Sequence, residues 1–62
     1  MKLYTEMDAG EQREWLARRM AFGTYSYDDI HRRVKALAKR IHSTPEKVYK
    51  NIQKDARMIA EG

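Results

Sequence analysis

The strongest constraint on the fold of this chain is one apolar stripe near its middle. Ile30, Val34, Leu37, Ala38 and Ile41 recur at the spacing of one face of an α-helix, and basic side chains fill much of the other face. Such a stripe is covered by other elements in a folded protein, because burying apolar surface drives folding. The pattern therefore predicts a helix over about 27–41 that packs against further helices.

Two more helices are predicted on either side of this stripe. Asp8, with Glu11 three residues later, is typical of a capped helix start, and Gly23 is a typical stop, which indicates a helix over about 8–21. Thr44 followed by Pro45 marks the start of a helix over about 45–60. The residues expected to face inward are Leu16 and Met20, with Trp15 adjacent, and then Val48, Ile52, Ala56 and Ile59. Since no strand pattern or internal repeat is present, the sequence predicts an all-α, compact three-helix domain over residues 1–62.

The sequence also indicates the roles of the segments outside these helices. Residues 1–7 are expected to form an arm, and Ser26, with Asp29 three residues later, is expected to cap the middle helix. The aromatic connection from Phe22 to Tyr27 is expected to cover one end of the core with its rings. Stacking of nucleic-acid bases on Tyr25 or Tyr27 is the alternative.

Composition restricts the chemistry that is open to a chain of 62 residues. The core is small, and the absence of cysteine excludes disulfides and thiol chemistry. His31 and His42 lack a metal-ligand spacing, and no nucleophile accompanies the Asp28–His31 pair, which resembles a general base. We expect no enzyme activity, no catalytic residue, no metal and no cofactor. No apolar run is long enough for a membrane span or a secretory signal, so we expect a cytoplasmic protein.

The net charge of +4 is unevenly distributed along the chain. Residues 1–29 hold four Lys/Arg and six Asp/Glu, a net charge of −2, whereas residues 30–62 hold nine and three, a net charge of +6. A basic half suits an anionic partner such as nucleic acid, and a solvated helical surface is the alternative explanation.

The basic half also contains a motif, LAKRIHSTPEKVYKNI, over residues 37–52. It resembles the helix-turn-helix of bacterial and phage DNA-binding regulators and recombinases, whose pattern is Leu/Ile-Ala-x-x-Leu/Ile-Gly-Val-Ser/Thr-x-x-Thr-Val-Tyr-x-x-Ile/Leu. The matching positions are Leu37, Ala38, Ile41, Thr44, Val48, Tyr49 and Ile52. Ala38 matches the small residue where the two helices cross, and Thr44 matches the cap of the recognition helix. The resemblance implies a helix-turn-helix over about 34–53.

Three positions depart from the pattern of this family. His42 replaces a glycine that eases a positive φ, Ser43 replaces a buried aliphatic residue, and Lys47 replaces a common threonine. We expect the first two departures to affect the geometry of the turn, which lies between the two helices of the motif.

The resemblance implies a small regulator of transcription or recombination that reads double-stranded DNA with its last helix in the major groove. The outward face of that helix would carry Thr44, Pro45, Glu46, Tyr49, Lys50 and Gln53. Gln53 suits adenine, Lys50 suits guanine or phosphate, and Glu46 suits the amino group of cytosine. Lys35, Lys39, Lys47 and Lys54 would contact phosphates, which position the protein without specifying the sequence.

The main alternative is a protein-interaction module, such as a phage-type inhibitor or adaptor of a host protein, with an interface patch that includes Met7, Met20 or Met58. A contiguous basic face that includes the outward side of the last helix would favour DNA. Scattered basic residues beside an apolar groove would favour a protein partner. A homodimer is also compatible with the sequence, because Met58 and Ile59 suit either the core or a contact between two copies.

Overall fold

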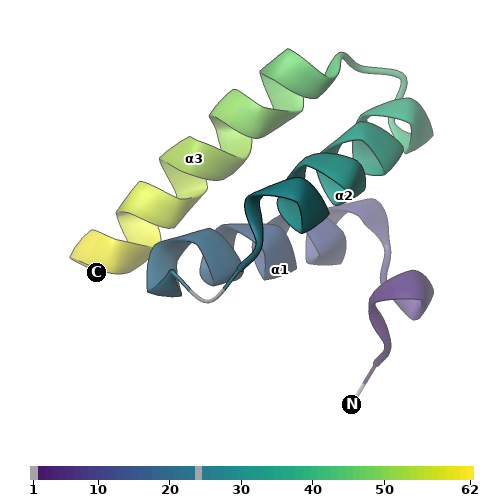
Figure 1. The fold of residues 1–62 in the computed structure, drawn as a ribbon. Coiled ribbons are helices and arrows are strands. Elements are labelled where there is room, and N and C mark those ends of the chain that lie inside the picture. Colours follow the sequence, from purple (N-terminus) through teal and green to yellow (C-terminus); the bar gives the residue numbers. More distant parts are fainter. Residues whose placement is uncertain (1, 24) are drawn as a thin grey trace.

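The computed structural model describes residues 2–23 and 25–62, which form a short 3₁₀ turn followed by three α-helices. The elements are η1 (Tyr4–Glu6), α1 (Ala9–Phe22), α2 (Tyr27–Arg40) and α3 (Pro45–Glu61). In Figure 1, α1 and α3 run in the same direction, and α2 runs back against them before the short turn into α3. This architecture confirms the all-α, three-helix class.

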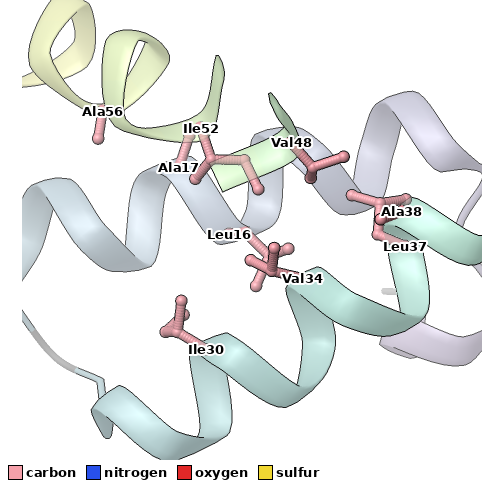
Figure 2. Close-up of a cluster of buried hydrophobic side chains, with 9 residues drawn as sticks. All are labelled: Leu16, Ala17, Ile30, Val34, Leu37, Ala38, Val48, Ile52 and Ala56. Carbon is pink, nitrogen blue, oxygen red and sulfur yellow. The ribbon is translucent and has the colours of Figure 1, made fainter. Parts of the chain in front are cut away.

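The core lies where the three helices meet. Figure 2 shows the buried apolar side chains: Leu16 and Ala17 from α1, Ile30, Val34, Leu37 and Ala38 from α2, and Val48, Ile52 and Ala56 from α3. The largest fully buried members are Leu16, Ile30, Val34 and Ile52. Burial of a side chain of this size stabilises the fold by about 1.5–3 kcal/mol, so each helix depends on the other two for its stability.

Most residues of the apolar stripes on α2 and α3 are buried, as expected. The exception is Ile41, at the C-terminal end of the α2 stripe. Ile41 is 45% exposed because α2 ends at Arg40 and Ile41 is its C-cap. On α1, Met20 is only half-buried, whereas Gln12 and Ala17, which the apolar pattern did not select, are buried.

Asp8 caps α1 as the sequence predicts, through a complete capping box with Glu11. Ser26 occupies the N-cap of α2, but its side chain makes no capping hydrogen bond, contrary to expectation. The carboxylate of Asp29, three residues later, accepts a hydrogen bond from Arg33 Nε at 3.3 Å.

The rings between α1 and α2 do not cover the core, which corrects the sequence-based expectation. Phe22 is 69% exposed, Tyr25 39% and Tyr27 61%. The aromatic rings that pack against the aliphatic core are instead those of Tyr4, Trp15 and Tyr49. Three aromatic side chains therefore remain on the surface at this end of the molecule.

The N-terminal arm is docked on the helices. The Tyr4 ring packs against Trp15 with 4.9 Å between the centroids, and Gln12 Nε2 donates to the carbonyl of Tyr4 at 2.9 Å. The Arg33 guanidinium lies 4.5 Å from the Tyr4 centroid and 5.0 Å from that of Trp15, and burial raises the pKa of Tyr4. A cation over aromatic faces is attractive, so these contacts hold the arm against α1 and α2.

Within residues 2–23 and 25–62, none of the helices combines the length and the apolar character that crossing a bilayer requires.

Candidate nucleic-acid interface

The turn between α2 and α3 fixes how the last helix leaves the core. The N–H of Ser43 donates to the carbonyl of Ala38 at 2.8 Å, and that of His42 donates to Lys39 at 3.4 Å. This pair of bonds, with His42 at φ +56°, forms a Schellman end to α2. The family's glycine position thus has the positive φ expected of it, although a histidine occupies it here.

The start of α3 is fixed by its own cap. The Thr44 hydroxyl accepts a hydrogen bond from the N–H of Lys47 at 3.3 Å, and Pro45 occupies the first turn. The Thr44 hydroxyl is thus used as an acceptor within the cap. Thr44 therefore contributes to the candidate site by setting the direction in which α3 begins.

The exposed side of α3 carries a row of cations. Lys47, Lys50, Lys54 and Arg57 are three, four and three residues apart, and all four are exposed. This spacing places them on one side of the helix, opposite the buried Val48, Ile52 and Ala56. Arg57 was not among the sequence-predicted site residues, and its spacing from Lys50 and Lys54 is the signal that finds it.

The exposed side of α2 adds a second row. Arg32, Lys35 and Lys39 are exposed and follow one another at intervals of three and four residues. Lys35 is one helical turn after His31, whose ring contacts Tyr49 of α3, so this row borders the junction of the two helices. Arg32 is a further residue that the sequence-based site did not include.

Carboxylates neutralise a different set of cations. In the described part of the chain, ion pairs join Lys2 to Glu11, Arg13 to Asp55, Arg18 to Glu14 and Arg33 to Asp29. Arg19 lies over the Trp15 ring, and Arg40 donates to the carbonyl of Met7. The seven remaining Lys/Arg side chains have no carboxylate within 4.0 Å among the described residues. They are Arg32, Lys35, Lys39, Lys47, Lys50, Lys54 and Arg57, and all of them lie on α2 or α3.

A shallow groove of about 370 Å³ runs between these two helices. Its lining residues are His31 and Val34 of α2 and Pro45, Glu46, Tyr49, Lys50 and Gln53 of α3. The groove therefore brings together five of the six residues expected on the outward face. Lys35 and Lys39 lie on the α2 side, and Lys47 and Lys54 lie further around α3.

Tyr49 projects less than the sequence suggests. It is half-buried, and its ring stacks on His31 with 5.1 Å between centroids and an interplanar angle of 24°. Loss of hydration at this position raises the pKa of Tyr49, with smaller contributions of the same sign from Tyr27 and Tyr25. The phenol is thus neutral at physiological pH and can donate a hydrogen bond.

Two acidic side chains lie near this surface. Glu46 lines the groove, and Asp28 is exposed in the first turn of α2. Each of them repels phosphate locally and can accept a hydrogen bond from an amino group.

The described residues contain no cluster of three or more His, Asp or Glu side chains arranged to hold a metal ion. His31 lies between Tyr27 and Tyr49, and its Nε2 is buried without a hydrogen-bond partner in the part of the chain that the structure covers. The imidazole of His31 is therefore packed against the rings of Tyr27 and Tyr49.

Comparison of the chain with models of protein families, with curated proteins and with solved structures gives no match.

Proposed function

We propose that the protein binds double-stranded DNA through the exposed sides of α2 and α3. The observation that carries this proposal is the separation of the charges. The cations of the N-terminal half lie beside carboxylates or rings, whereas the seven that have neither a carboxylate, a ring nor a carbonyl partner among the described residues all lie on α2 and α3. Such a surface attracts a polyanion and releases counterions from it, which is the main source of affinity for DNA.

The proposed roles follow from the position of each side chain. Lys50 and Gln53 line the groove, where Gln53 would reach a base edge and Lys50 would reach guanine or phosphate if α3 enters the major groove. Glu46, one turn before Lys50, would accept from the amino group of cytosine. Lys35, Lys39, Lys47 and Lys54 would contact phosphates on either side, and we add Arg32 and Arg57 to this group.

A regulator of transcription or recombination is the role that we propose for such a protein. Pairing of two copies would let it read two half-sites about one turn of DNA apart, which is how small proteins of this type gain specificity.

One observation favours the alternative of a protein partner. Met58 is 63% exposed and borders a second hollow, of about 450 Å³, between α1 and α3. An exposed apolar side chain beside a concavity is typical of a protein contact. Met58 is one helical turn after Lys54, so this hollow borders the row of cations on α3.

The test is a titration of random-sequence duplex DNA, followed by fluorescence anisotropy over a series of salt concentrations. We compare wild type with Lys50→Gln and with Arg18→Gln, which removes the same charge from an exposed residue paired with Glu14 on α1. We expect Lys50→Gln to weaken binding and to reduce the slope of log K against log salt by about 1. Arg18→Gln is expected to leave both quantities nearly unchanged.

Two results would contradict the proposal. The first is no measurable binding of duplex DNA even at low salt. The second is an equal loss of affinity in both variants, which would mean that only the total charge matters and that α3 is not the contact surface.

A further inference from the structure

The aromatic side chains at the start of α2 form a ladder that leads to the proposed DNA surface. The Tyr27 ring lies against His31 with 4.3 Å between centroids and a tilt of 47°, and His31 stacks on Tyr49. Tyr49 in turn lines the groove with Lys50 and Gln53. The ladder thus runs from the first residue of α2 to the groove between α2 and α3.

This ladder is open at one end. Tyr49 is half-buried between the helices and His31 contacts both of the other rings, whereas Tyr27 is 61% exposed. A planar aromatic group that stacked on the free side of Tyr27 would continue the ladder. Stacking of a nucleobase on an aromatic side chain contributes about 1–3 kcal/mol per base.

We propose that Tyr27 is a stacking site for an unpaired nucleobase, so that the preferred DNA carries a single-stranded segment beside the duplex. This inference rests on the proposed function, because the duplex would be held by the cations of α2 and α3. A base within a duplex is already stacked on its neighbours, and only an unpaired base has a free face for Tyr27.

The charges around Tyr27 fit a nucleotide. Arg32 and Lys35 follow on the same helix and have no carboxylate partner among the described residues, so they can attract the phosphates of the strand. Asp28 is the next residue in the first turn of α2; its carboxylate repels phosphate but can accept from the amino group of a base. This arrangement favours a strand whose base points toward Tyr27 and whose backbone lies toward the cations.

The experiment compares three labelled probes by fluorescence anisotropy at low salt. They are a blunt duplex, the same duplex with a short single-stranded tail, and the tail strand alone. The proteins are wild type, Tyr27→Leu, Tyr27→Trp and the matched control Phe22→Leu, which removes an equally exposed ring outside the ladder. Circular dichroism of each variant establishes that the helices are retained.

We expect the tail to raise the affinity of wild type about five- to hundredfold over the blunt duplex. Tyr27→Leu is expected to abolish this gain and to bind the blunt duplex like wild type. Tyr27→Trp and Phe22→Leu are expected to keep it. Retention of the gain in Tyr27→Leu, or its equal loss in Phe22→Leu, would overturn the stacking site.

The two proposals fail in different ways. Wild type that binds the blunt duplex without any gain from the tail contradicts the stacking site and leaves the duplex proposal standing. Binding of tailed DNA and of the tail strand, with none of the blunt duplex, contradicts the duplex proposal and retains the stacking site. If no probe binds, both proposals fail, and the exposed rings are then better explained as a contact for a protein.

Discussion

His42 takes a backbone conformation that most residues avoid. Its φ of +56° is the only positive value at a non-glycine residue in the described part of the chain. The left-handed conformation costs an L-residue about 1–2 kcal/mol, and glycine avoids this cost. We expect His42→Gly to raise the free energy of unfolding by about 1 kcal/mol, which corresponds to about 4–8 °C in Tm for a domain of this size. Thermal unfolding followed by circular dichroism measures the change.

The matched control for this prediction is His42→Ala. Alanine removes the imidazole but keeps the Cβ, so the conformational cost remains. An equal gain in stability for both variants would show that the imidazole itself, and not the backbone conformation, is unfavourable.

Because of Asp8, the stability of the protein is expected to change with pH in the acid range. The N–H of Glu11 donates to its carboxylate at 2.8 Å, and this bond holds the pKa of Asp8 below its ordinary value of 3.8. A carboxyl with a lowered folded-state pKa stabilises the fold above its unfolded pKa, and it loses this effect as the pH falls through the folded pKa. Asp8→Asn keeps a good N-cap but does not titrate. We therefore expect the Tm advantage of wild type over Asp8→Asn to shrink as the pH falls below about 4. A difference that stays constant across the acid range would contradict this.

Individual residues also show where the sequence stops being informative. The positive φ at His42 followed from the motif, because the position requires it whichever residue is present. The missing capping bond at Ser26 did not, because a favourable residue type at the N-cap does not fix the rotamer of its hydroxyl. Whether the Ser26 hydroxyl turns toward a free N–H of the first turn is decided only in three dimensions.

At the scale of the elements, Ala38 controls how closely α2 and α3 approach. It is 1% exposed and lies in the core with Val48 and Ile52. A larger side chain here overpacks the contact, so we expect Ala38→Leu to lower the free energy of unfolding by about 1–3 kcal/mol. Ala36→Leu is the control, since Ala36 is exposed on the same helix. Urea unfolding measures both, and equal effects would contradict a tight crossing at Ala38.

The helices and their buried faces were largely predictable, because periodicity and capping residues are local signals. The rings of Phe22, Tyr25 and Tyr27 were not, because their burial depends on how much core volume the aliphatic residues leave unfilled. Ala17 was missed for a related reason. A small residue contributes little to an apolar pattern, and its burial follows from the close approach of another helix.

At the scale of the whole molecule, one small core serves all three helices. The total stability of a chain of this length is about 3–9 kcal/mol at typical values per residue. Ile52 is fully buried, and truncation of such a side chain to alanine costs about 2–5 kcal/mol. We expect Ile52→Ala to lower the Tm strongly and to melt all three helices in a single transition. Met58→Ala, at an exposed position of the same helix, is expected to change the Tm little. Separate transitions for α3 and the other helices in Ile52→Ala would contradict a shared core.

The candidate site also depends on the whole molecule, because it is formed by side chains of two helices. The sequence could therefore predict only part of it. The motif identified Lys50 and Gln53, because it fixes positions within a helix. The basic surface as a whole depends on which cations have partners, and contacts such as Arg13 with Asp55 join residues far apart in the chain.

The packing around Trp15 gives the molecule an optical reporter of its own. Trp15 is the only tryptophan, and it is surrounded by the Tyr4 ring and by the guanidinium groups of Arg19 and Arg33. Its emission therefore reports whether the N-terminal arm is docked, without any label. Since Trp15 does not line the groove between α2 and α3, a ligand in that groove can be distinguished spectroscopically from one that displaces the arm.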